Sequence, residues 1–157
     1  MGSLTSAVPD GSRILLDSAS VVYYLERNPT YFALAAEWME RVNAGRLTAA
    51  ASVLLLSEVL VPAYRAGKPA AARQARSALE RIPNFEIVEV DAAVSDAAAR
   101  LRAEYNLRTP DALHVATALN EGAAWIVTND RRLKRVEAEG IRVWLFDDHL
   151  AGAPSLS

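Results

Sequence analysis

Cysteine is absent from the 157 residues of this sequence, which excludes disulfide bonds and zinc sites built on cysteine. Histidine is scarce as well. The chain has only His114 and His149, so it cannot assemble a metal site from several histidines of one chain. A metal ion bound here would be held mainly by oxygen atoms, which are the ligands that Mg²⁺ and Mn²⁺ prefer.

Long hydrophobic runs and a strong net charge are also missing. The most apolar run, residues 47–56, is too short for the ~20 residues that a membrane-spanning helix needs. Residues 1–12 lack the basic start and the apolar core of a signal peptide, and we interpret them as a flexible leader. These absences predict a cytoplasmic protein without membrane contact. The formal net charge of −2 does not indicate a nucleic-acid-binding protein, although clustered carboxylates can mask a basic surrounding.

The composition is that of a globular domain. Hydrophobic residues make up 52% of the chain and charged residues 23%, which is typical of a folded protein. A chain of this length can bury a full core as one domain. We expect the domain to span residues 13–150 and a short tail to follow at residues 151–157.

Short apolar runs alternate along the chain with segments of helical spacing. The runs predict strands, and the segments between them predict helices. This alternation is typical of an α/β fold with one parallel sheet and helices on both of its faces. The expected strands are 14–16, 47–51, 85–90, 124–128 and 141–145, and the expected helices are 18–27, 30–44, one that follows Ser52 and carries Glu58, 68–82, 91–105, 109–119 and 131–136.

Three acidic residues occupy positions where ligands collect in such a sheet. Asp17 directly follows an apolar strand, Asp130 lies two residues after the end of another, and Asp111 lies at the start of a helix. The carboxyl ends of parallel strands border the crevice in which ligands bind. Each acid also has a purely structural interpretation, because aspartate is favoured as a helix N-cap and in the first helical turn.

Glu58 calls for a different explanation. Its neighbours in residues 53–61 are apolar on almost every side, which predicts a buried helix. A buried carboxylate is costly unless an arginine or a cation compensates its charge. Several carboxylates close together repel one another, and a divalent cation removes that penalty. The acids together therefore predict a metal site.

Four motifs, in this order, resemble the PIN-domain ribonucleases, and particularly their VapC-type toxins. The motifs are ILLDS at residues 14–18, LSEVL at 56–60, TPDALHVATAL at 109–119 and IVTNDRRL at 126–133. The resemblance implies a five-stranded parallel sheet in a three-layer α/β/α sandwich. It also implies RNA cleavage that depends on Mg²⁺ or Mn²⁺.

The resemblance assigns the metal-binding and catalytic roles residue by residue. It places them on Asp17, Glu58, Asp111 and Asp130, with the hydroxyl groups of Ser18 and Thr128 orienting the acids or a water molecule. Some relatives carry a further acid directly after the position of Asp130, where this chain has Arg131 and Arg132. The number of metal ions, one or two, therefore stays open.

The expected mechanism is hydrolysis of a phosphodiester by a metal-bound water. Asp130 or Glu58 could take the proton of that water. Arg131 and Arg132 neighbour the predicted site and are expected to contact RNA phosphates, which would position the RNA without reading its sequence. His114 lies on the same helix face as Asp111 and could touch substrate or be packed in the core. The resemblance further implies a homodimer that is blocked by a cognate antitoxin.

Two other functions remain open at this point. The first is a PIN-like nuclease of RNA maturation that has no antitoxin. The second is a non-catalytic domain that binds a cation for regulation, as receiver-like folds do. A receiver would carry paired acids after the first strand and a lysine near the fifth, whereas this chain has Asp17-Ser18 and no such lysine.

Overall fold

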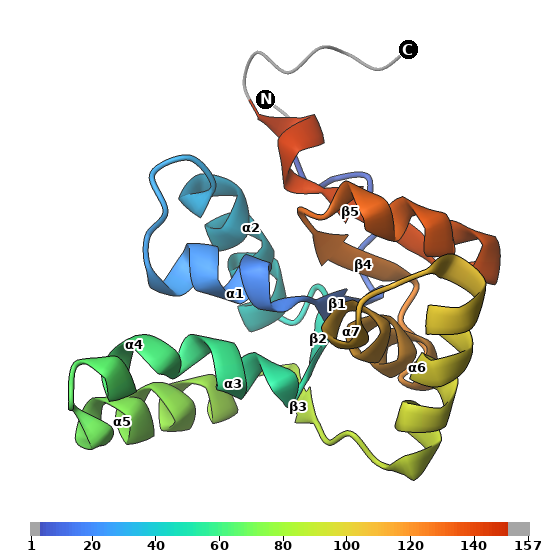
Figure 1. Ribbon diagram of the computed structural model, residues 1–157. Helices are drawn as coiled ribbons and strands as arrows, with labels where there is room; N and C mark the ends of the chain where they lie inside the picture. Colours follow the sequence, from blue (N-terminus) through green and yellow to red (C-terminus); the bar gives the residue numbers. More distant parts are fainter. Residues whose placement is uncertain (1–3, 151–157) are drawn as a thin grey trace.

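Five parallel strands form one sheet at the centre of the molecule (Figure 1). The computed structural model describes residues 4–150. The strand order is β3-β2-β1-β4-β5, so β1 lies in the middle. The strands are β1 (Arg13–Leu16), β2 (Thr48–Ser52), β3 (Phe85–Val88), β4 (Trp125–Thr128) and β5 (Arg142–Leu145). The predicted parallel sheet is confirmed, with β3 two residues shorter than expected.

Helices cover both faces of the sheet and give the predicted three-layer sandwich. The first face packs on α1 (Ser18–Leu25) and α2 (Phe32–Asn43). The second packs on α6 (Ala92–Tyr105), α7 (Thr109–Asn120) and the 3₁₀ helix η1 (Arg131–Glu139).

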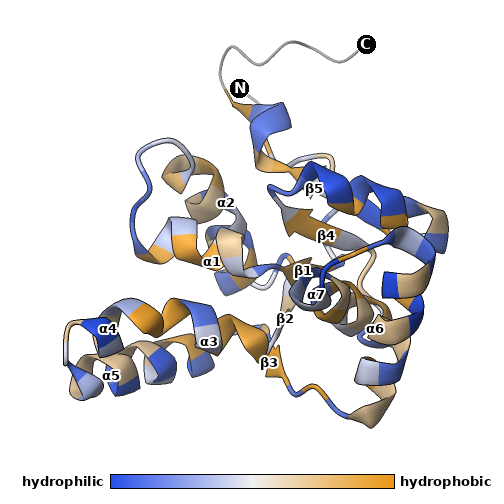
Figure 2. Ribbon diagram, in the orientation of Figure 1, coloured by the Kyte–Doolittle hydropathy of each residue, from blue (hydrophilic) through white to orange (hydrophobic). Residues whose placement is uncertain are grey.

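Successive side chains of a strand point to opposite faces, and β1 shows this directly. Ile14 and Leu16 enter the first core, whereas Leu15 enters the second. Trp38 and Trp144 are buried together in the first core, with ring centroids 5.0 Å apart. Figure 2 shows that η1 is largely hydrophilic, yet Leu133 and Val136 anchor it in the second core.

Three helices form an arm that projects from the edge of the sheet (Figure 1). They are α3 (Leu54–Val59), α4 (Val61–Arg65) and α5 (Pro69–Glu80). Pro62 lies in the first turn of α4, where its missing N–H is tolerated, and the helix is interrupted before it at Leu60.

The prediction that Glu58 is buried is wrong. The side chain is exposed on α3, and Leu55 is the one buried residue of that helix. The apolar residues around Glu58 are only half-buried, because the arm stands beside the body of the protein and is not enclosed by it. An apolar sequence thus indicated a buried helix, whereas the tertiary position leaves its acid in solvent.

Residues 4–12 pack against α2, so the expectation of a flexible leader does not hold for them. Thr5 and Val8 are fully buried. The buried guanidinium of Arg41 donates to the backbone oxygens of Thr5 (2.8 Å) and Val8 (2.6 Å) and to Oδ1 of Asp10 (2.8 Å). A buried arginine needs such partners, and the segment supplies them. Residues 1–3 of the expected leader and the expected tail at 151–157 lie outside the described residues.

A second 3₁₀ helix, η2 (Phe146–His149), completes the described fold. Its Asp147 accepts a hydrogen bond from the hydroxyl of Tyr31, which directly precedes α2. Within residues 4–150, no helix combines the length and the apolar character that a membrane crossing requires.

Candidate active site

The order of the strands creates a crevice at the carboxyl end of β1. From β1 the chain builds β2 and β3 on one side and then returns to build β4 and β5 on the other. Ligands bind at such a reversal point in α/β sheets. A cavity of about 510 Å³ opens here and is lined by Asp17, Ser18, Ala19, Tyr23, Glu58, Arg108, Pro110, Asp111, His114, Asn129 and Asp130.

The four acids predicted from the sequence therefore line one cavity, although each comes from a different segment. Asp17 ends β1, Glu58 lies on the arm, Asp111 lies in the first turn of α7 and Asp130 follows β4. The helix-cap interpretations hold at the same time. Asp17 is the N-cap of α1 and Asp130 is the N-cap of η1.

Asp17 lies at the base of the cavity in a poorly solvated position. Burial, with a smaller contribution from the nearby charge of Asp111, raises the pKa of its carboxyl from 3.8 to about 6. Hydrogen bonds from Thr128 and from Ser20, whose backbone nitrogen lies 3.2 Å from Oδ1, oppose this shift. The Asp17 carboxylate thus carries a negative charge that its own surroundings compensate only in part.

Thr128 links two of the acids. Its hydroxyl donates to Oδ2 of Asp17 and accepts from the backbone nitrogen of Asp130 at 3.1 Å. The predicted role of Thr128 near the acids agrees with this position. Ser18 instead pairs with His114, with 3.3 Å between Oγ and Nε2. Burial lowers the pKa of His114, so its ring is neutral at neutral pH.

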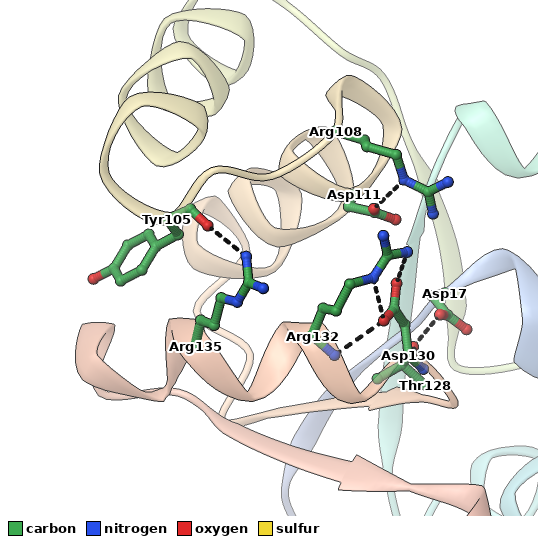
Figure 3. Close-up of polar contacts among 8 residues, drawn as sticks. All are labelled: Asp17, Tyr105, Arg108, Asp111, Thr128, Asp130, Arg132 and Arg135. Atoms are coloured by element: carbon green, nitrogen blue, oxygen red, sulfur yellow. Dashed lines mark hydrogen bonds and ion pairs between the residues drawn. The ribbon is translucent and has the colours of Figure 1, made fainter.

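Asp111 and Asp130 are each paired with an arginine at the mouth of the cavity (Figure 3). Nε of Arg108 lies 3.2 Å from Oδ2 of Asp111. Arg132 holds Asp130 at two points, with Nε 3.0 Å from Oδ1 and a terminal nitrogen 2.8 Å from Oδ2. The hydrogen bonds of Arg132 lower the pKa of Asp130, which is the opposite of the shift at Asp17.

The donor chemistry of the cavity suits a hard divalent cation. All four acids offer carboxylate oxygens, and Asp17 lacks full compensation of its charge. The side-chain positions are not yet those of a closed metal site. Within residues 4–150, no group of three or more His, Asp or Glu side chains is arranged to hold an ion. Two of the acids point to arginines instead, so a bound cation requires Asp111 and Asp130 to reorient.

Comparison with known families identifies the chain. Residues 14–139 match the PIN domain. The chain belongs to the PIN-domain family. This match covers all four sequence motifs, from β1 to η1, and it confirms the family predicted from the sequence. A comparison with curated protein sequences finds no match.

Solved structures share the PIN fold of this chain. A toxin–antitoxin complex from Klebsiella pneumoniae is 24% identical, with a TM-score of 0.58 over 74% of this chain and 86% of that chain. VapBC2 from Rickettsia felis, bound to a DNA fragment from the promoter, is 20% identical, with a TM-score of 0.64 over 85% and 98%. VapC20 from Mycobacterium tuberculosis, a toxin that cleaves the sarcin–ricin loop, is 16% identical, with a TM-score of 0.56 over 72% and 86%.

Several residues of the PIN-domain cavity were not predicted as site residues. Tyr23 lines it from α1, whereas Arg108 and Asn129 line it from the segments just before α7 and η1. Of the cavity residues outside the predicted set, His114 was the one for which the sequence gave an indication, because it lies three residues after Asp111.

Arg131 differs from its neighbour Arg132. It pairs with Asp148 of η2 and does not contact the acids, so the structure separates the two predicted RNA-binding arginines.

Proposed function

We propose that this chain is a ribonuclease that depends on Mg²⁺ or Mn²⁺ and acts as the toxin of a toxin–antitoxin pair. The proposal rests on one observation: acids from four separate segments line a single cavity at the reversal point of a PIN-domain sheet. Structural roles as helix caps or in ion pairs would not require the four acids to lie in one cavity.

Four carboxylates would hold the cation, namely Asp17, Glu58, Asp111 and Asp130. When bound, a divalent cation supplies a water of lowered pKa and neutralises charge that develops on the phosphate. Thr128 and the backbone of Ser20 hold the Asp17 carboxylate in place. Glu58 is exposed at the rim and is suited to accept the proton of the attacking water, with Asp130 as the alternative. The expected products carry 5′-phosphate and 3′-hydroxyl ends.

The cavity also offers groups that can meet the RNA. Arg132 lies beside Asp130 at the mouth of the cavity, and guanidinium groups bind phosphate oxygens in pairs. Ser18 and His114 lie side by side on its wall and can orient a water molecule or a ribose hydroxyl.

An antitoxin and a homodimer belong to the same proposal. The solved structures that share this fold include toxin–antitoxin complexes from Klebsiella pneumoniae and Salmonella typhimurium, which supports an antitoxin as partner. A toxin that acts on cellular RNA would work in the cytoplasm. A gene for a small DNA-binding protein directly beside the gene of this chain would favour the toxin over a nuclease of RNA maturation.

Digestion of single-stranded RNA tests the proposed reaction. The wild-type chain should cut with Mg²⁺ or Mn²⁺ and stop with EDTA. Asp17→Asn and Asp111→Asn should each cut roughly 100-fold more slowly, because each removes a charged ligand. Asp91→Asn is the matched control, since Asp91 is also a helix N-cap but lies outside the cavity. Undiminished cutting in EDTA, or equal cutting by all four proteins, would refute the mechanism.

A further inference from the structure

Two arginines of the chain form ion pairs with two acids of the proposed metal site. Arg108 pairs with Asp111 and Arg132 with Asp130, and Figure 3 shows both pairs. The two pairs also influence each other, because Arg108 acts electrostatically on Asp130 and Arg132 acts on Asp111. The four side chains thus form one cluster of two positive and two negative charges.

The arginine side of each pair is open to solvent and the acid side faces the cavity. Arg108 is 68% exposed and Arg132 is 50% exposed, whereas the side chains of Asp111 and Asp130 are 20% and 24% exposed. Exposed ion pairs contribute little to stability, since water and salt compensate separated charges. Both arginines can therefore leave their acids at small cost without disturbing the core.

The charges of the arginines and of a divalent cation are equal. Two guanidinium groups carry +2, and so does one Mg²⁺ or Mn²⁺ ion. A cation that takes the oxygens of Asp111 and Asp130 leaves the charge balance of the cavity unchanged. It also releases two planar groups whose donors match the oxygens of a phosphate.

We propose that Arg108 and Arg132 exchange partners when the site is loaded. In the cation-free chain they neutralise Asp111 and Asp130, and in the loaded chain they bind the RNA phosphates beside the scissile bond. This inference rests on the proposed function, because it assumes that the four acids bind a cation. It assigns to Arg108 a role that no sequence motif indicated, and it sets Arg132 apart from Arg131, whose partner is Asp148.

The exchange predicts that the arginines weaken cation binding. Titration calorimetry with Mn²⁺ in the absence of RNA should show roughly two- to five-fold tighter binding for Arg108→Ala and for Arg132→Ala, as expected for the loss of an exposed competing pair. The double variant should bind more tightly than either single variant. Arg76→Ala is the matched control, because it breaks an exposed Arg–Glu pair on α5. It should bind Mn²⁺ like the wild type.

The same variants should bind RNA less well. Fluorescence anisotropy of a labelled single-stranded RNA in Ca²⁺, with its integrity checked on a gel, should show weaker binding by Arg108→Ala and Arg132→Ala. Each variant should also reduce the slope of the logarithm of the RNA affinity against the logarithm of the salt concentration. The reduction should correspond to the loss of about one phosphate contact. Tighter Mn²⁺ binding together with weaker RNA binding is the signature of the exchange.

The outcomes separate the two proposals. Equal or weaker Mn²⁺ binding by the arginine variants, in a wild-type chain that does bind Mn²⁺, overturns the exchange and leaves the proposed nuclease standing. Unchanged RNA binding by the arginine variants also overturns the exchange and leaves the proposed nuclease standing. A wild-type chain and variants that all fail to bind Mn²⁺ overturn the proposed function, and the exchange with it.

Discussion

Asp17 and Asp91 are both N-caps of helices that follow strands, but only Asp17 lines the cavity. Their difference comes from the sheet. Asp17 follows the central strand, between β2 and β4, whereas Asp91 follows the edge strand β3. The sequence around the two residues looks alike, so pattern alone could nominate Asp17 but could not distinguish a ligand from a cap. Its place in an ordered set of four motifs is what predicts the role of a ligand.

The raised pKa of Asp17 makes the stability of the cation-free chain depend on pH. The folded carboxyl has a pKa of about 6 against an ordinary value of 3.8, so the folded state holds the proton more tightly than the unfolded state. The contribution of this group to the free energy of unfolding therefore falls as pH rises from about 4 to above 6. From about pH 5 to pH 7, the free energy of unfolding of the wild type should fall by roughly 1 kcal/mol relative to that of Asp17→Asn.

Urea unfolding in EDTA at both pH values measures this difference. Asp91→Asn should keep the pH dependence of the wild type, because Asp17 is intact in it. Parallel pH dependence of the wild type and Asp17→Asn would show that burial does not raise the pKa of Asp17.

Thr128 should determine how far that pKa rises. Its hydroxyl donates to the Asp17 carboxylate and so favours the charged form. In Thr128→Val the pKa of Asp17 should move above about 6, as read from the carboxyl carbon in an NMR titration. Thr117→Val is the control, since it removes a buried hydroxyl that bonds to Leu113 inside α7. An unchanged or lowered pKa in Thr128→Val would contradict the assignment.

At the scale of elements, the strands and most of the helices could be predicted in their order, but α4, η2 and the surroundings of the elements could not. Periodicity is a local property, and it located all five strands near their observed positions. Burial is not local. The apolar sequence around Glu58 gave no sign that α3 would stand in a projecting arm, and residues 4–12 gave no sign that a buried Arg41 would hold them. Arg108 was missed although its pair with Asp111 spans only three residues, because nothing in the sequence indicated that its side chain would line the cavity.

The segment before β1 should depend on one side chain of α2. Arg41→Ala removes a buried charged donor from the carbonyl oxygens of Thr5 and Val8, which should cost about 2–4 kcal/mol of stability. The Thr5 oxygen still accepts from the backbone N–H of Val8. Hydrogen exchange of residues 5–12 should rise more than that of the sheet. Arg46→Ala is the control, because its backbone oxygen still accepts from Gly11. Unchanged exchange in Arg41→Ala would show that burial of Thr5 and Val8 suffices.

At the scale of the whole molecule, the cavity joins the arm to the body of the protein. Glu58 is on the arm, and the other three acids are on the body. A cation bound by both would link them. Because Glu58 is exposed, its replacement should not disturb the fold itself.

Cation binding should therefore stabilise the entire chain. At a Mn²⁺ concentration about 100 times the dissociation constant, the gain is roughly 2.7 kcal/mol, or a rise in melting temperature of about 5–10 °C. Glu58→Gln should melt like the wild type in EDTA and should gain clearly less from Mn²⁺ in thermal scans. Glu89→Gln, which removes an exposed acid outside the cavity, should gain as much as the wild type. A full gain in Glu58→Gln would exclude Glu58 as a ligand.

The parallel pairing of β4 with β1 has a consequence for synthesis of the protein. Asp17 is made 111 residues before its neighbour Thr128, and Asp130 follows Thr128. A nascent chain that stops before β4 has no complete cavity. Translation itself thus delays any activity of this site until β4 and Asp130 have been made.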